Sequence, residues 1–249
     1  MNGRNRNIIC TILSAAGLSV AACSSGGTPT APIPTLSTQT STPTLPSPLP
    51  GSAPATARYR VTFQATWSAA THPEDFPSNP HFSGLIGGTH NASVTFWREG
   101  ALATDGIKNM SERGSKTPLD REVEAAIAAG TAEHLLSGGS IPLSPASVDL
   151  EFEIGQAFPL VTLVSMVAPS PDWFVGVAGL VLFENGQWVD ERRIDLDPWD
   201  AGTDSGVTFT SPDLETMPRQ PVSRIRTAPL SPAGRVTPMG TFTFRRLSQ

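Results

Sequence analysis

The sequence predicts a mainly β protein, an antiparallel β-sandwich with one or two short helices inserted. Most periodic segments after residue 57 alternate apolar and polar residues, which is the pattern of half-buried strands. Turn residues separate these short segments, as they do in sandwiches. Residues 117–127 are the clearest stretch that repeats apolar residues at a helical spacing.

The first 22 residues have the pattern of an export signal. Arg4 and Arg6 give a positive start, and a short apolar run and small residues follow. The apolar run is shorter than the roughly 20 residues that a membrane-spanning helix needs. The sequence VAAC, which ends at Cys23, resembles the bacterial lipoprotein box, whose cysteine carries lipid. We therefore expect export and lipid anchoring in the bacterial cell envelope, with an ordinary signal peptide as the alternative.

Residues 23–57 have the composition of a linker between the lipidated Cys23 and a domain. They are rich in proline, threonine and serine and carry no charge, so they cannot bury a core. Residues 58–249 have the length of a single domain. The net charge of −5 argues against a nucleic-acid partner, which requires a basic surface.

The expected strands run from residue 59 to residue 246. The first, YRVTFQATW, alternates apolar and polar residues over its whole length. The segments that we expect to be strands are 59–67, 92–97, 148–154, 160–167, 174–183, 188–196, 206–210, 222–227 and 240–246.

The clearest helix signal begins with Thr117 as the expected N-cap and Pro118 as the first helical residue. Gly130 is the expected stop. The apolar residues that share one face of this helix are Leu119, Val123 and Ile127. A shorter helix is expected near residues 104–113.

A predicted hairpin brings distant acids to one end of the sheet. Asn185 and Gly186 lie between two apolar-rich runs, and Asn-Gly is the strongest short-range hairpin signal. With these two as the turn residues, Asp172 lies opposite Trp199, next to Asp200. The loop WDAGTDSG, residues 199–206, then adds Asp204 to the same end.

Three carboxylates held together repel one another. At about 5 Å, each pair costs roughly 1 kcal/mol in water and about 3 kcal/mol at an effective dielectric of 20. A calcium ion removes this cost, because it takes roughly 6–8 oxygen ligands. Asp172, Asp200 and Asp204 are therefore candidate calcium ligands, and all-oxygen ligation argues against zinc or copper. The alternative is that Asp200 and Asp204 only close turns with their own backbone.

The same acids leave a hydrolase open as a formal alternative. Asp172 and Asp200 could act as the acid pair of a glycosidase, although a bound cation would occupy both carboxylates. The sequence contains no G-x-S-x-G motif for a nucleophilic serine. Catalysis is therefore the weaker hypothesis.

Five tryptophans could pack the core or stack on a sugar. Trp67, Trp97 and Trp188 alternate with polar residues on expected strands, which favours core packing. Trp173 and Trp199 flank the predicted metal site, where they brace the loops or contact a ligand. We favour bracing.

Two long segments resemble the spondin N-terminal domain. They are SMVAPSPDWFVGV, residues 165–177, and DLDPWDAGTDSGVTFTSPD, residues 195–213. This domain occurs in the extracellular matrix proteins F-spondin and mindin and in bacterial exported proteins. Segments 59–77, 81–100 and 103–114 fit the same pattern, so the resemblance covers about residues 57–226.

The resemblance implies a calcium-binding β-sandwich, with some likeness to C2 domains, that serves adhesion and matrix contacts. Its calcium aspartates map onto Asp172 of SPDW and onto Asp200 and Asp204 of WDAGTDSG. We therefore expect a non-catalytic adhesion or ligand-binding module that binds an extracellular protein or glycan. The alternatives are a hydrolase of surface polymers and a structural envelope protein that calcium only stabilises.

Overall fold

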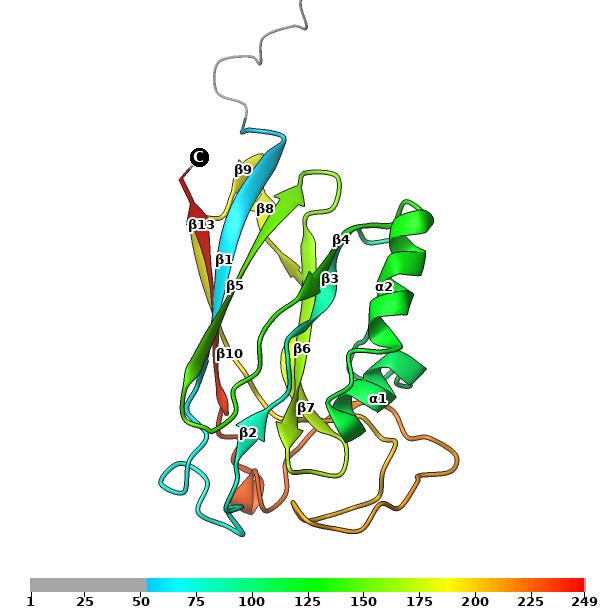
Figure 1. Cartoon of the computed structure of the whole chain (residues 1–249), viewed down its shortest axis with the longest axis vertical. Coiled ribbons are helices and arrows are strands. Elements are labelled where there is room, and N and C mark those ends of the chain that lie inside the picture. The colour runs from blue at the N-terminus through cyan, green and yellow to red at the C-terminus, as the bar shows by residue number, and fades with distance from the viewer. Residues whose placement is uncertain (1–52, 249) are drawn as a thin grey trace, which may run out of the picture. The chain divides into compact units, whose positions relative to one another are not determined.

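A computed structural model describes residues 53–248 (Figure 1). The predicted signal at residues 1–22, the predicted lipid site at Cys23 and most of the predicted linker lie outside the described residues. None of the described helices is long and apolar enough to cross a membrane.

The first sheet contains four antiparallel strands. Their order across the sheet is β10 (Glu191–Asp195), β13 (Gly240–Leu247), β1 (Thr56–Ala65) and β5 (Ser147–Gly155). Side chains along β1 alternate between buried and exposed or partly exposed, because one face of this sheet meets the core and the other meets solvent. The exposed face carries cross-strand ion pairs, such as Arg58 and Arg60 with Glu151.

The second sheet is larger and lies between the first sheet and the helices. Its order is β12 (Ser223–Arg224), β11 (Trp199–Asp200), β7 (Trp173–Val181), β6 (Leu160–Ala168), β3 (Ile86–His90) and β4 (Ala132–Ser137). The short β2 (His81–Phe82) also pairs with β6. A separate two-stranded hairpin contains β8 (Phe183–Glu184) and β9 (Gln187–Trp188).

The helices are α1 (Asp105–Arg113) and α2 (Leu119–Ala128), and a 3-10 turn covers Pro232–Gly234. Thr104 caps α1 by accepting a hydrogen bond from the Ile107 N–H at 3.1 Å. The prediction that Thr117 caps α2 was wrong. The Thr117 hydroxyl donates to the Asp120 carboxylate instead, and the cap residue is Pro118, which has no side-chain cap bond.

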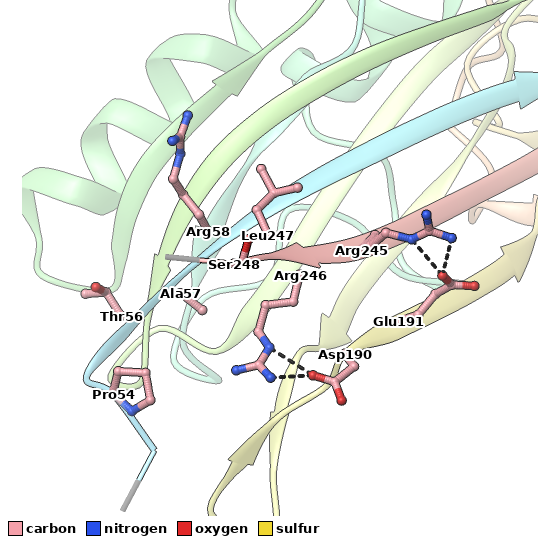
Figure 2. A pocket seen from close by; sticks show the side chains of 10 residues that line it. All are labelled: Pro54, Thr56, Ala57, Arg58, Asp190, Glu191, Arg245, Arg246, Leu247 and Ser248. Carbon is pink, nitrogen blue, oxygen red and sulfur yellow. Dashed lines mark hydrogen bonds and ion pairs between the residues drawn. The ribbon is translucent and has the colours of Figure 1, made fainter.

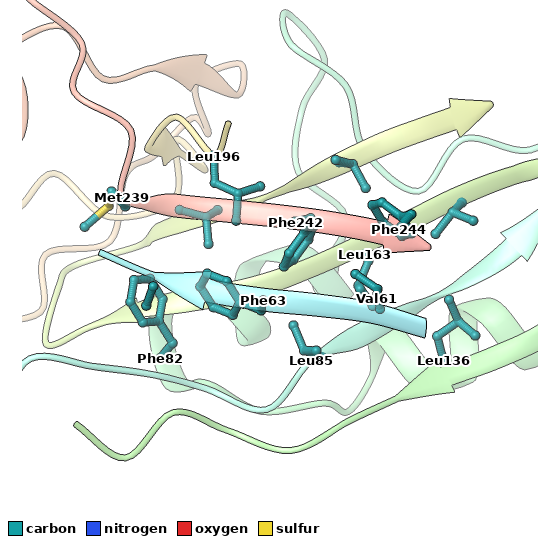
Figure 3. Packing of buried hydrophobic residues seen from close by; sticks show 14 of the residues in the cluster. Val61, Phe63, Phe82, Leu85, Leu136, Leu163, Leu196, Met239, Phe242 and Phe244 are labelled. Carbon is teal, nitrogen blue, oxygen red and sulfur yellow. The ribbon is translucent and has the colours of Figure 1, made fainter. Parts of the chain in front are cut away.

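Two apolar clusters hold the layers together. Between the sheets, Val61 and Phe63 of β1 pack beside Phe242 and Phe244 of β13 (Figure 3). The second cluster lies between the second sheet and the helices, where α1 and α2 cover the sheet (Figure 1). Its members include Ile86, Ile107, Val123, Val164 and Phe174. Successive residues of β6 join alternate clusters, which explains why nearly the whole strand is buried.

The antiparallel sandwich class is confirmed, and so are the strands expected at 59–67, 148–154, 160–167 and 240–246. The segment 174–183 corresponds to β7 and the start of β8, and 188–196 divides into β9 and β10. The strands expected at 92–97 and 206–210 were wrong, since both segments are loops, and only Ser223–Arg224 of 222–227 is a strand. The strands β2, β3, β4 and β11 lie outside the segments that were expected to be strands.

Candidate metal centre

The three predicted ligands lie just before β7, at the end of β11 and in the loop that follows β11. Asp172 directly precedes β7, and Asp200 is the second residue of β11. The two segments pair antiparallel, with Trp199 opposite Phe174 and Asp200 opposite Trp173. The Ala201 N–H then donates to the Asp172 carbonyl at 3.2 Å. The fold therefore places Asp172 beside the WDAGTDSG loop.

The predicted register was wrong, although the neighbourhood that it predicted is present. Phe174, and not Asp172, lies opposite Trp199. The turn itself is confirmed, because β8 and β9 pair around Asn185 and Gly186, both with positive φ. After this turn, β10 leaves to pair with β13 in the first sheet, and the chain returns to β7 only at β11. The hairpin is thus interrupted, and its register does not carry through.

Asp172 is the most deeply buried of the three acids, with none of its surface exposed. Its Oδ2 accepts hydrogen bonds from the Thr203 N–H at 2.7 Å and the Asp204 N–H at 3.1 Å. The Thr203 hydroxyl also donates to this oxygen at 3.2 Å. Its Oδ1 is buried and has no hydrogen-bond partner among the described residues. One half of this carboxyl group is therefore unsatisfied, which is rare for a buried polar group.

Asp200 and Asp204 close local turns, as the turn interpretation predicted. Asp200 Oδ1 accepts from the Gly202 N–H at 2.7 Å. Asp204 Oδ1 accepts from the Gly206 N–H at 2.7 Å, and its Oδ2 accepts from the Leu214 N–H at 2.9 Å. These bonds fix the loop, and they do not prevent the same oxygens from binding a cation through their other lone pairs.

The three carboxyl groups are electrostatically coupled. Burial, and after it the charge of Asp200, raise the pKa of Asp172 to about 7, against the opposing effect of the Thr203 and Asp204 hydrogen bonds. Burial also raises the pKa of Asp200, and the charge of Asp204 adds to this effect. Each acid thus makes ionisation of the next more costly.

The donor chemistry of these residues fits an oxygen-binding cation. A proton removes the charge of a buried carboxyl group, whereas a positive ion offsets the charge and also takes the unpartnered oxygen as a ligand. However, no three His, Cys, Asp or Glu side chains within residues 53–248 converge closely enough to hold a metal ion. The pKa shifts show that Asp200 is near Asp172 and that Asp204 is near Asp200. To bind one metal ion together, the three side chains would have to move closer to one another.

Comparisons with known proteins identify the family. Residues 57–235 match the family model described as Spondin_N. The chain belongs to the spondin N-terminal domain family. The matched region agrees with the segments that carried the resemblance in the sequence.

This spondin domain has relatives among animal proteins. Spondin-2 of Rattus norvegicus is 35% identical over 206 residues, covering 78% of this chain and 62% of the relative. Spondin-2 of Homo sapiens is 36% identical over 197 residues, covering 78% and 58%. Spondin-1 of Mus musculus is 36% identical over 177 residues, covering 67% of this chain and 21% of the relative. The chain thus spans about three fifths of the Spondin-2 relatives and about a fifth of Spondin-1.

The tryptophans of the spondin domain serve packing. All five are buried, and Trp199 is the most exposed at 9%. Trp173 packs on Phe209, and Trp97 packs on Trp199, with ring centroids 5.4 and 5.3 Å apart. Core packing and loop bracing are therefore confirmed for these residues. A sugar-stacking platform would require an exposed ring face.

An acidic hollow beside Asp204 was not predicted from the sequence. It has a volume of about 180 Å³, and its lining includes Lys108, Glu112, Asp204 and Glu215. The Lys108 ammonium forms ion pairs with Glu112 at 2.6 Å and with Glu215 at 3.6 Å. The backbones of Glu215 and Asp204 pair in an isolated antiparallel β-bridge. Because α1 and the loop after β11 are far apart in the sequence, no local pattern indicates this contact.

A second hollow, of about 550 Å³, lies near the two ends of the described chain (Figure 2). Arg246 pairs with Asp190, and Arg245 pairs with Glu191 at 2.7 Å. Arg58 also lines this hollow and pairs with Glu151 outside it, so each of these arginines has an acidic partner and none is left to bind an anion.

Proposed function

We propose that this spondin domain is a non-catalytic, calcium-binding module for adhesion or ligand binding, anchored in the cell envelope by lipid on Cys23. The observation that carries the calcium proposal is the buried, unpartnered Oδ1 of Asp172. Membership of the spondin family supports the adhesion role.

The cost of a buried charge at Asp172 favours a bound cation. An ionised Asp172 in this environment is destabilised by burial and by Asp200. A divalent cation reverses this penalty, since it offsets the charges of both acids and of Asp204 together. Calcium is favoured over magnesium because its coordination is flexible and accepts loop carbonyls. In this proposal the ion ties the start of β7 to the loop after β11.

The position of this loop suits contact with an extracellular protein or glycan. In Figure 1 the start of β1, where the predicted linker enters, and the loops after β11 lie at opposite ends of the described domain. A lipid anchor at Cys23 would hold the domain by the first end. The loop end is the end of the described domain farther from the start of β1.

A catalytic role is less well supported by the geometry. A general acid or base must come within hydrogen-bond reach of a substrate. Asp172 has no exposed surface, although its raised pKa would otherwise suit proton transfer. This is why the proposal is a binding module and not a hydrolase.

Isothermal titration calorimetry with calcium chloride, on protein first stripped with a chelator, tests the metal. We expect saturable binding to the wild type and to Asp149→Ala, which removes an exposed acid from the other sheet. Asp200→Ala should lose at least about tenfold in affinity. No calcium heat in the wild type, and no change of melting temperature on chelation, would reject the metal. Binding to matrix proteins and glycans with and without calcium then separates adhesion from a purely stabilising role.

Metabolic labelling with an alkyne fatty acid in a bacterial host tests the anchor. Label is expected in the wild type and in Cys10→Ser, the matched control within the predicted signal. It should be absent from Cys23→Ser. Equal labelling of all three proteins would refute lipidation at Cys23.

A further inference from the structure

β7 has an unpaired edge over most of its length. On one side it pairs with β6 along nearly the whole strand. On the other side, β11 pairs only with Trp173 and Phe174, and no other described strand takes over at residues 175–181. In an extended strand, half of the main-chain N–H and C=O groups point to each side. This edge is therefore a template for a further strand.

A groove of about 320 Å³ runs along this edge. β7 forms one wall, and Ile194 and Asp195 of β10, an edge strand of the first sheet, form the other. Val177 and Leu180 contribute apolar side chains from β7, and Ala178 is the exposed residue of this strand. The groove thus combines unpaired main chain with an apolar floor.

An arginine lies near each end of the open edge of β7, and of the two only Arg224 lines the groove. At one end, the Arg192 guanidinium donates to the Val181 carbonyl at 3.0 Å. At the other end, Arg224 lies 5.0 Å from the Trp199 ring and pairs with Asp197 at 2.9 Å. Residues 175–178 span about 13 Å as extended strand, and an irregularity at Gly179, with a φ of 62°, follows before Val181. The opening therefore matches a short extended segment.

The β11 end of the groove also contains donors without acceptors. Trp97 Nε1 and Arg224 Nε are buried and have no hydrogen-bond partner among the described residues, and both residues line the groove. Trp97 is 6% exposed. Buried donors of this kind require an acceptor to be satisfied. Because these two atoms are themselves buried, an acceptor from a ligand reaches them only after the side chains move.

The charges along the groove favour a neutral or weakly basic occupant. The lining includes the acids Glu99, Asp195 and Asp197 and the bases Arg98 and Arg224. Because Arg224 is paired with Asp197, the remaining lining charges are two acids and one base. An acidic segment would therefore be disfavoured.

We propose that this groove binds an extended peptide segment of a partner protein as an added strand on β7. The peptide main chain pairs with residues 175–178, ahead of the irregularity at Gly179, and alternate aliphatic side chains enter the space near Val177, Leu180 and Ile194. This inference rests on the proposed function in one respect, which is that the domain binds a partner protein. It does not depend on the aspartate site, because Asp172, Asp200 and Asp204 do not line the groove.

The test starts with selection of linear heptapeptides from a phage-displayed library on the intact protein, in chelator and again in calcium. Selected peptides are synthesised, and their affinities are measured by fluorescence anisotropy. We expect neutral or weakly basic peptides with alternating aliphatic residues. N-methylation of alternate peptide amides should weaken binding at least about tenfold, because it removes main-chain donors and leaves the side chains unchanged.

Ala178→Trp fills the groove with a side chain at an exposed position. Ala125→Trp makes the same change on the exposed face of α2 and is the matched control. Circular dichroism and melting temperature establish that both variants fold. We expect peptide binding to be lost in Ala178→Trp and retained in Ala125→Trp.

Several outcomes overturn the proposal. These are no enrichment of peptides, equal binding to Ala178→Trp, or indifference to N-methylation. A concentration-dependent dimer in sedimentation velocity that Ala178→Trp abolishes would assign the groove to a second copy of the chain instead. Because binding is expected in chelator, failure of the peptide test leaves the calcium proposal standing, and failure of calcium binding leaves the groove standing.

Discussion

The substitution Asp172→Asn tests whether the charge of the buried Asp172 carboxyl group is compensated by a proton or by a bound cation. Asparagine keeps the shape of the side chain and removes its ionisation. Its carbonyl oxygen can still accept from the Thr203 and Asp204 N–H groups that now bond to Oδ2. Any pH dependence that differs between the two proteins therefore reports on the charge of Asp172.

The sign and size of the effect follow from the raised pKa. In the folded protein without metal, Asp172 titrates at about 7, against an ordinary value of 3.8. Between these values the folded state holds a proton that the unfolded state has lost, so stability falls as pH rises. The contribution is fully present below about pH 4 and is lost as pH rises through 7. The full difference corresponds to about 4 kcal/mol.

Urea unfolding between pH 4 and pH 8 measures this difference. In chelator, the free energy of unfolding of the wild type should fall relative to Asp172→Asn by up to about 4 kcal/mol, or roughly 10 °C in melting temperature. With saturating calcium, the wild type should regain stability at pH 8 and the variant should not. At 100 times the dissociation constant, the gain is about 2.7 kcal/mol.

Asp149→Asn is the matched control, because Asp149 is exposed on β5 and bonds only to Thr62 among the described side chains. Its stability should follow the wild type in both conditions. If wild type and Asp172→Asn keep a constant difference from pH 4 to pH 8 in chelator, Asp172 is not desolvated as the geometry indicates. If calcium stabilises both equally, Asp172 is not a ligand.

Three other substitutions test the framework around the site by thermal melting. Gly202→Ala should destabilise the loop and weaken calcium binding, because Gly202 has a φ of 72° and a Cβ there would lie 2.1 Å from the Gln220 carbonyl oxygen. Phe63→Ala should lower the free energy of unfolding by about 3–5 kcal/mol, since the ring is fully buried between the sheets. An unchanged melting temperature would contradict this packing. Thr104→Ala should lower the free energy of unfolding by about 1–2 kcal/mol, because the Thr104 hydroxyl caps α1 and donates to Glu122 of α2 at 2.7 Å. This loss should be smaller when Glu122→Gln is already present, since the two residues are in contact.

The sequence predicts the first sheet better than the second for a physical reason. β1 and β13 have one face on the core and one largely toward solvent, so their residues alternate visibly. β3 is covered on both faces and is buried at every position, so IGGTH shows no alternation. Its Gly87 is required because a Cβ there would lie 1.9 Å from the Thr162 carbonyl oxygen. Such a close contact between strands is not visible in a local pattern.

The opposite error occurred at residues 92–97. ASVTFW alternates like a strand, yet this segment is a loop whose Phe96 and Trp97 pack into the cluster beneath the helices. Burial of apolar side chains was predicted correctly there, whereas strand pairing was not. Alternation reports which residues are buried, and it cannot show whether a neighbouring strand is available.

The residues of the candidate site could be predicted from the sequence because they lie in two short segments. Asp172, Asp200 and Asp204 are the acids of two motifs, and the Asn185-Gly186 turn indicates that those motifs approach each other. The unpartnered oxygen of Asp172 was not predictable, since it depends on the register of β11 against β7. Calcium binding and lipidation at Cys23 stay predictions.

The wrong register and the peptide groove have one structural origin. A continuous hairpin from the Asn185-Gly186 turn would have paired β7 along its whole length and left it no free edge. Instead, β10 crosses to β13 in the first sheet, and β11 returns to β7 for two residues only. This crossing joins the two layers through one chain segment, and it leaves residues 175–181 without a partner on that side. The crossing of β10 to the first sheet therefore explains both why the predicted hairpin register was wrong and why β7 keeps a free edge for a partner strand.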